Sequence, residues 1–449
     1  MVVTSPFMAS QVEAAFLDKP ASICTTLEVI TGGPSLMTMH GSTWKKWRSL
    51  FNPGFAIGYM TGLAPALADE VSVFCELLQD RAKRRAMFQL EEYTLRLTFD
   101  VIARITLDAR LNYQTQGSAL ADCLRRQVYW SPFGTTFNPF RRYLSPRPIV
   151  QKYNSYRMNR YLDGEIDKRF EELGLSRASS KDSKSQSRSI ISLAMDKYLA
   201  ELGDRGEISK RAFKYLAKPH LRMFLYAGHD TTSSTLLYCY YLLSCHPAVL
   251  SKVRDEHDRV FGSNSSIENV KRAMSDDTAL LNQIAYTTAV IKEVLRIFPP
   301  AASLREGRPD LVLTDEQGQR YPTDGCNIWT LNLAMHHSPD VFVQPEEFIP
   351  DRWLVGPDHP LYPKKASWRA FEWGPRNCIG QTLAQLELKV ALVMTARLFD
   401  ITPVYDEWDK IHPRKGVKTV DGNRVYQAEM GGGGAHPVDG FPVRVTLRD

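Results

Sequence analysis

The chain lacks several patterns that would place it in a class at once. Its seven cysteines are scattered, with no CxxC pair and no Cys/His cluster at the spacing of a zinc site. This argues against a disulfide framework and a structural zinc site, and it favours a reducing compartment. We expect six of the cysteines to be small buried apolar residues, with only Cys378 in a reactive setting.

Long apolar runs are missing too. Residues 1–20 carry no basic flank and no extended apolar stretch, so they are predicted to be neither a signal peptide nor a membrane anchor. The most apolar later stretch, Leu236–Cys245, is shorter than the roughly 20 residues that span a bilayer. The sequence therefore predicts no transmembrane segment in this chain.

No dense basic run interleaved with aromatic residues is present, although the net charge is +6. The Lys and Arg residues are spread along the chain, which argues against nucleic-acid binding. A solvated charged surface explains this balance, and a basic patch that docks an acidic protein partner is the alternative. With 43% hydrophobic and 24% charged residues, no linker and no repeat, the 449 residues are predicted to form a single domain, mainly α with a small β portion.

Helical periodicity dominates the chain. One helix is expected to begin at Gly41 and to end before Pro53. Pro219 suits the first turn of a long helix that reaches Cys245. Further helices are predicted over residues 65–84, 91–106, 154–173 and 282–298.

Strand signals come later in the chain. Residues 312–315 and 319–321 are predicted to form a hairpin, 327–333 an alternating strand, and the last residues another strand. Residues 176–189 are basic and low in complexity, which predicts a mobile surface loop.

One cysteine stands in a loop suited to metal binding. The stretch FEWGPRNCIG, Phe371–Gly380, places Cys378 between two glycines, with Arg376 two residues before it and an amphipathic helix after it. A helix N-terminus and a metal cation both favour a thiolate, and a guanidinium group binds anions. The loop is therefore predicted to hold sulfur against a metal, beside an anionic ligand. A buried structural cysteine is the alternative.

The stretch AGHDTT, Ala227–Thr232, violates helix propensity inside the long helix. Glycine in a helix interior costs about 1 kcal/mol relative to alanine, and Asp and Thr are also poor helix formers. The missing side chain of Gly228 is expected to face a cofactor. The Thr231 hydroxyl can reach the Ala227 carbonyl and loosen the helix ladder, which would open a groove. A simple helix bend is the alternative.

Two weaker patterns lie on helix faces. Glu293 and Arg296 are three residues apart, and Trp44 and Arg48 are four apart, so each pair shares a face. Such pairs are common on surfaces, and alone each predicts no more than an amphipathic helix.

Taken together, these motifs resemble the cytochrome P-450 family, whose Phe-x-x-Gly-x-Arg-x-Cys-x-Gly signature FEWGPRNCIG matches at every fixed position. The resemblance implies a cytochrome P-450 fold with heme b (iron protoporphyrin IX) between the long central helix and the Cys-loop helix. Cys378 would be the axial thiolate ligand, which favours O–O cleavage. The cofactor-binding residues that it implies are Trp44, Arg48, Ala227, Gly228, Arg305, Phe371, Gly374, Arg376 and Gly380.

The resemblance also implies individual roles. Arg376, the Trp44–Arg48 pair and Arg305 would hold heme propionates, with Arg308 as the rival of Arg305. Asp230 and Thr231 would be the acid and alcohol that relay protons, whereas His229 has no role. A structural triad that fixes the cysteine loop would consist of Glu293, Arg296 and Arg352. Substrate would lie against residues 301–304 and 431–435.

The implied activity is that of a heme-thiolate monooxygenase, an oxidoreductase. It would insert one oxygen atom from O2 into a lipophilic small molecule, with electrons from an NADPH–cytochrome reductase, a FAD/FMN flavoprotein. The wording of residues 227–234 and 335–353 is most like fungal members, many of which act in secondary-metabolite biosynthesis. The alternatives are a heme-thiolate isomerase or dehydratase, and a non-catalytic heme-binding remnant. The family implies the cytosolic face of the endoplasmic reticulum membrane, and a cytosolic or peripheral location is the alternative.

The resemblance fails at the start of the chain. Anchored family members carry an apolar segment, a helix and two strands before the Trp-x-x-x-Arg helix, whereas 43 residues precede Trp44 here. We therefore expect an N-terminally truncated chain, or a real but compromised form. Without those strands, the strand at 327–333 is expected to have an open edge, which predicts poor solubility.

Overall fold

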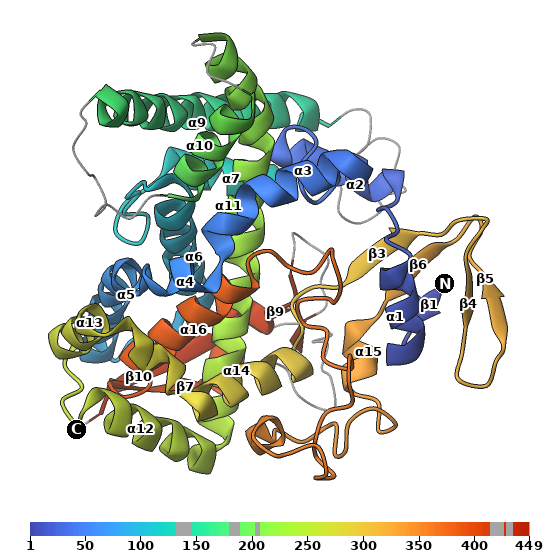
Figure 1. Ribbon diagram of the computed structural model, residues 1–449. Coiled ribbons are helices and arrows are strands. Elements are labelled where there is room, and N and C mark those ends of the chain that lie inside the picture. Colours follow the sequence, from blue (N-terminus) through green and yellow to red (C-terminus); the bar gives the residue numbers. More distant parts are fainter. Residues whose placement is uncertain (132–144, 179–188, 203–206, 414–425, 428–433, 449) are drawn as a thin grey trace.

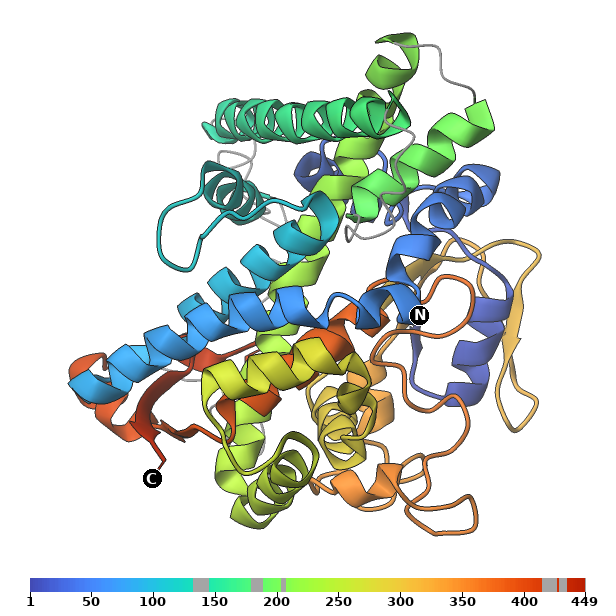
Figure 2. The ribbon, with the colours of Figure 1, turned by 60° about the vertical axis from the view of Figure 1, so that its left-hand side comes forward.

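The computed structural model describes residues 1–131, 145–178, 189–202, 207–413, 426–427 and 434–448. The molecule is mainly helical with small sheets, as predicted (Figure 1). Helix α11 (Glu207–Cys245) runs through its middle, with other long helices crossing it or packed along it (Figures 1 and 2).

Helix α6 (Leu90–Leu107) packs along α11 through both apolar and hydroxyl side chains. The Thr98 hydroxyl donates to the His229 carbonyl at 2.7 Å, and the hydroxyls of Thr94 and Ser233 lie 2.7 Å apart. Because these side chains are buried, the bonds fix how α6 and α11 meet.

The prediction that Pro219 opens the long helix is wrong, because α11 begins twelve residues earlier, at Glu207, and contains Pro219 in its interior. The extra turns are held by the neighbouring helix α9 (Arg147–Ala178). Lys214 pairs with Asp167 at 2.6 Å, and Lys218 pairs with Asp163 at 2.9 Å. These contacts offset the hydrogen bond that proline removes from a helix ladder.

The predicted helices are present as α3, α5, α6, α9 and α14, with ends that differ by a few residues. Helix α14 begins at Ala285, not at 282, because the Glu256 carboxylate accepts hydrogen bonds from the backbone of Tyr286 and Thr287 at 2.7 and 2.8 Å. Besides α6, α9 and α11, the described α-helices have the following bounds: α1 (Pro6–Ala14), α2 (Ala21–Thr31), α3 (Gly41–Phe51), α4 (Ile57–Thr61), α5 (Ala64–Arg84), α7 (Ala119–Tyr129), α10 (Ile190–Leu202), α12 (Pro247–Phe261), α13 (Ile267–Asp276), α14 (Ala285–Ile297), α15 (Asn332–His336), α16 (Gln381–Thr395) and α17 (Tyr405–Ile411).

The sheets are short. One has the order β1 (Val2–Val3), β6 (Asn327–Thr330), β3 (Ser303–Glu306), and another the order β2 (Phe88–Gln89), β10 (Pro442–Leu447), β7 (Phe399–Pro403). The predicted hairpin is present as β4 (Val312–Thr314) and β5 (Arg320–Pro322), and β8 (Tyr426–Gln427) pairs with β9 (His436–Pro437).

The predicted open edge at 327–333 is wrong. Strand β6 is the central strand of its sheet, parallel to β1 with Val2 opposite Trp329, and antiparallel to β3 with Ser303 opposite Thr330. The strand ends at Thr330, because α15 begins at Asn332. The expectation of poor solubility therefore loses its physical reason.

Other expectations have mixed outcomes. Residues 176–178 form the end of α9, and residues 179–188 of the expected loop lie outside the described residues. All seven cysteines are free. Cys75, Cys123 and Cys239 are buried as expected, whereas Cys24 and Cys326 are half-buried and Cys245 is exposed. Among the described helices, none has the length and apolar character needed to cross a membrane.

Candidate active site

Cys378 lies three residues before Gln381, the first residue of α16. Its backbone N–H donates to the Phe371 carbonyl at 2.9 Å, which closes the loop. Gly374 takes a φ of +79°, a conformation that favours glycine. The Phe371 ring packs against Trp368, with ring centroids 5.8 Å apart. The loop thus presents the cysteine side chain at a helix N-terminus.

The thiol of Cys378 has an unusual environment. Burial raises its pKa, while backbone N–H groups of Gly380 and Gln381 and the charge of Arg48 lower it. The residue nevertheless carries exposed surface. Neighbouring protein thus shields the cysteine, and yet it keeps surface that a ligand could contact.

Arg376 lies close to this cysteine. Its guanidinium stacks over the rings of Phe16 and Trp44, at 4.9 and 4.8 Å from their centroids. One terminal nitrogen donates to the Met39 carbonyl at 3.1 Å and to Asp18 at 3.3 Å. Its Nε is buried and has no hydrogen-bond partner among the described residues. The group is thus held in place with a donor to spare.

The structure distinguishes the two rival arginines. Arg305, on β3, lines a small space together with Arg376, and burial lowers its pKa. Arg308 is half-exposed and pairs with Asp310 at 3.1 Å. Lys19 lies near Arg305 and Arg376, and its pKa is lowered to about 8 by burial and by these two charges. This gathering of cations is suited to an anionic group.

Trp44 and Arg48 lie on α3, as predicted, but Arg48 does not have all its donors free. It donates to the backbone and side-chain oxygens of Asn377 at 2.9 and 3.0 Å, and to Asn52 at 2.9 Å. Trp44 is buried beside Arg376. Arg48 therefore binds the cysteine loop directly, and its role at a propionate stays a prediction.

The structure brings Glu293, Arg296 and Arg352 together. Arg296 donates to both Glu293 oxygens at 2.9 and 3.1 Å, and Arg352 donates to Oε1 at 2.9 Å. The indole of Trp353 donates to Oε2 at 2.9 Å. The arginines also donate to carbonyl oxygens of residues 336, 343–345 and 347. The group anchors the chain between α14 and the cysteine loop.

The AGHDTT stretch lies at the centre of α11. The Thr231 hydroxyl donates to the Ala227 carbonyl at 2.8 Å, as expected from its spacing, although the helix continues past it. A Cβ on Gly228 would lie 2.8 Å from Ile102 of α6. The expected reason for this glycine is therefore wrong, because the missing side chain admits Ile102. Ala227, Gly228, Asp230 and Thr231 are half-buried, whereas Tyr226, His229 and Thr232 are fully buried.

Asp230 has partners that the sequence analysis missed. Its Oδ2 accepts from the Gly434 backbone at 2.7 Å, and its Oδ1 lies 3.2 Å from Nε2 of His436. The other ring nitrogen of His436 lies 2.7 Å from Glu91 Oε1. Burial would raise the pKa of Asp230, but His436 lowers it to about 2. No local spacing could have indicated this group, since its members come from three distant segments.

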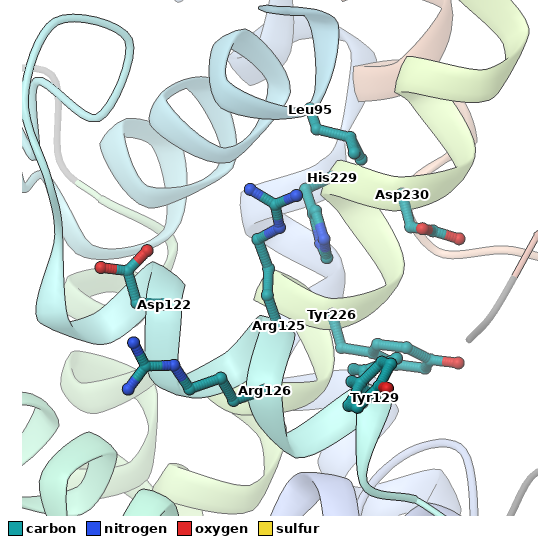
Figure 3. Close-up of a pocket in the computed structure, with 9 residues that line it drawn as sticks. Leu95, Asp122, Arg125, Arg126, Tyr129, Tyr226, His229 and Asp230 are labelled. Carbon is teal, nitrogen blue, oxygen red and sulfur yellow. The ribbon is translucent and has the colours of Figure 1, made fainter. Parts of the chain in front are cut away.

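A cavity of about 450 Å³ borders Asp230 on the side of α7. Figure 3 shows α7 and α11 facing each other across it, with Arg125, Arg126 and Tyr129 from α7. Arg125 is committed to Glu92, to which it donates twice, at 2.9 and 2.7 Å. The cavity therefore brings space for a ligand or water up to the predicted proton-relay residue. Of the predicted substrate wall, residues 431–433 lie outside the described residues.

The residues present fit a heme with a thiolate ligand. The donor set contains one reachable thiol at a helix N-terminus. It also contains the buried Nε of Arg376, which has no partner within the part of the chain that the structure describes, and the adjacent cation Arg305. A thiolate and several cations are what an iron porphyrin with two carboxylates requires.

Comparison with known proteins agrees with this geometry. The family model for Cytochrome P450 matches residues 10–425. The chain is 36% identical to cytochrome P450 monooxygenase polC of Polytolypa hystricis, over 100% of this chain and 79% of the relative. It is 30% identical to cytochrome P450 monooxygenase acrF of Aspergillus aculeatus, over 100% of this chain and 92% of the relative.

The fold is also similar to a solved structure. The crystal structure of the heme domain of cytochrome P450DA matches with a TM-score of 0.75, covering 100% of this chain and 88% of that one. At 20% sequence identity, this likeness speaks for the fold alone.

Proposed function

Because the chain belongs to the cytochrome P450 family and is an oxidoreductase enzyme of the monooxygenase type, we propose that it inserts one oxygen atom from O2 into a lipophilic small molecule. In the balanced reaction, the substrate, O2, NADPH and a proton give the oxygenated product, water and NADP⁺. We propose an NADPH–cytochrome reductase as the source of electrons, and a place in fungal secondary metabolism. The expected location is the cytosolic face of the endoplasmic reticulum.

The observation that carries the proposal is the position of Cys378. It lies at the N-terminus of α16, its sulfur accepts from backbone N–H groups, and the residue keeps exposed surface. When bound there, heme would supply the redox chemistry of O2, which no side chain can provide. Cys378 would ligate the iron, and Arg376 and Arg305 would hold the carboxylates.

The chain itself would control protons. Thr231 is held by the Ala227 carbonyl and can turn its hydroxyl toward the half-buried face of α11. Asp230 is the adjacent acid. An acid and an alcohol in this order can pass a proton from Asp230 Oδ to Thr231 Oγ1. The intact pair favours a monooxygenase over an isomerase or a dehydratase.

The test compares the spectra of two cysteine variants after reduction and binding of carbon monoxide. We expect Cys378→Ala to lose the thiolate band in the carbon monoxide difference spectrum of the reduced protein. The matched control, Cys245→Ala, removes an exposed free cysteine and should keep the band. An unchanged spectrum in Cys378→Ala would overturn the proposal.

A second measurement separates the alternative activities. With reductase and lipophilic candidate substrates, a monooxygenase consumes NADPH and O2 in step with product. A product formed without either would indicate an isomerase or a dehydratase. Absence of heme uptake would indicate a remnant.

A further inference from the structure

Asp230 is joined to two segments that lie far from it in the chain. His436 is 206 residues away and comes from β9, while Glu91 comes from the first turn of α6. Each ring nitrogen of His436 faces one carboxylate, at 3.2 Å for Asp230 and 2.7 Å for Glu91. The Nε2 contact has hydrogen-bond geometry, whereas Nδ1 lies within ion-pair distance of Glu91 without the geometry of a hydrogen bond. A carboxylate on each side of the ring favours the charged imidazolium, because its positive charge offsets theirs.

The surrounding charges favour the same state. Burial alone would lower the pKa of His436, but Asp230 and Glu91 raise it to about 10. Tyr226 and His229 on α11 and Arg125 on α7 are further titratable groups near Asp230. His229 Nδ1 donates to the Leu225 carbonyl of its own helix at 2.7 Å, and Arg125 is paired with Glu92. Neither of them competes for the two carboxylates.

The backbone beside His436 is fastened as well. The Gly434 N–H donates to Asp230, the Ala435 N–H donates to the Pro300 carbonyl at 3.1 Å, and the Ser234 hydroxyl donates to the Ala435 carbonyl. Residues 434–436 therefore lie across α11, next to the chain that follows α14. The Asp230 carboxylate is the group on which both the backbone and the side chain of this segment converge.

We propose that His436, held by Glu91, is a positioning residue that orients the Asp230 carboxylate for proton delivery and ties it to segment 434–436. When Asp230 carries a proton, that proton enters from solvent through the adjoining cavity and passes on to Thr231 Oγ1, while His436 keeps its own proton. The electron count is unchanged, since only protons move. This inference rests on the proposed function for its turnover measurement and not for its structural one.

The structural measurement uses NMR of heme-loaded protein labelled with carbon-13 histidine, with the His436 signal assigned from its loss in His436→Gln. The signal should keep its protonated position above about pH 8, where a free imidazole with a pKa of about 6.5 is neutral. In Asp230→Asn and in Glu91→Gln it should titrate at lower pH. A His436 signal that titrates near neutral pH in the unaltered protein would overturn the proposal.

The turnover measurement needs no substrate. With reductase and NADPH, peroxide formation takes one NADPH and one proton per O2, whereas formation of two waters takes two NADPH and two protons. We expect His436→Gln to raise the peroxide released per NADPH by about three- to tenfold, because proton delivery contributes large factors to such steps. His436→Lys keeps a cation with several donors, so its peroxide yield should lie between those of His436→Gln and the unaltered protein.

Control measurements distinguish a failure of the proposed function from a failure of the inference about His436. His412→Gln changes an exposed histidine stacked on Trp408 and should leave the peroxide yield unchanged. The carbon monoxide spectrum and melting temperature of each variant show that heme and fold are intact. If the unaltered protein lacks the thiolate band, the proposed function fails, and the NMR measurement then tests the inference by itself. If the band is present and His436→Gln has an unchanged peroxide yield, the inference alone fails.

Discussion

Two buried charge networks hold the predicted site, and they differ in what carries the positive charge. Around Glu293 the cations are Arg296 and Arg352, all three side chains are 0% exposed, and carbonyl oxygens take up the remaining donors. Around Asp230 the cation is His436, and these side chains are each 19% exposed.

This difference decides whether the charge of each network changes with pH. Arginine stays charged at every pH at which a protein folds, so the Glu293 network has a single state. His436 loses its charge only as the pH rises toward 10, so the Asp230 network has a second state at high pH. We infer that the first network fixes the chain leading to Cys378, while the second is free to take part in proton movement.

The largest expected effect comes from Glu293→Gln. This variant keeps the shape but leaves two buried guanidinium groups without a counter-charge, which should cost about 3–5 kcal/mol in the free energy of unfolding. Urea unfolding of the heme-loaded protein measures it. Asp80→Asn, which breaks an exposed pair with Arg84 at 3.0 Å, is the control and should have little effect. A loss below about 1 kcal/mol for Glu293→Gln would remove the contrast between the networks.

The next effect is a pH dependence confined to the second network. The pKa of His436 is raised to about 10 in the folded state, so its protonation stabilises the fold fully below about pH 6.5. That contribution is lost as the pH rises toward 10. The difference in unfolding free energy between the unaltered protein and His436→Gln should therefore be on the order of 2–4 kcal/mol at low pH and shrink toward zero.

The same titration sharpens the comparison. The destabilisation by Glu293→Gln should stay constant from about pH 6 to 9, because its partners are arginines. Unfolding curves collected at several pH values measure both variants together. A His436→Gln effect that does not change with pH would mean that the two networks behave alike.

The smallest expected effect concerns the backbone approach to Asp230. A Cβ on Gly434 would lie 3.1 Å from Asp230 Oδ2 and 3.3 Å from the Pro300 carbonyl oxygen, so Gly434→Ala should cost about 1 kcal/mol. Gly164→Ala is the matched control. It lies exposed in α9 with open space at its Cβ position, and should stabilise by up to about 1 kcal/mol. Melting temperatures of the two variants should thus move in opposite directions.

The two networks also differ in how far the sequence predicts them. Glu293 and Arg296 are three residues apart on one helix, and the motif order suggested Arg352 as their partner. The hydrogen bonds among them follow that expectation. His436 and Glu91 carry no spacing that relates them to Asp230, because tertiary structure alone brings α6, α11 and β9 together.

The fold shows the same division. Elements determined by local sequence could be predicted, whereas elements determined by contacts between distant segments could not. Long periodic helices such as α5 and α6 could be predicted within a residue or two. The start of α11 could not, since ion pairs with α9 override the local preference of Pro219. Strand β1 is two residues long, too short to have a periodicity, yet it covers the edge of β6 that was expected to be open.

Helix α11 has a consequence for how this protein can vary. Asp230 and Thr231 point as they do because of their rotational phase along a 39-residue helix. Each inserted or deleted residue would turn everything beyond it by about 100°, carrying Asp230 away from His436. The helix can therefore tolerate exchanged side chains but not a changed residue count between Pro219 and Thr231, and gaps in related sequences should avoid this interval.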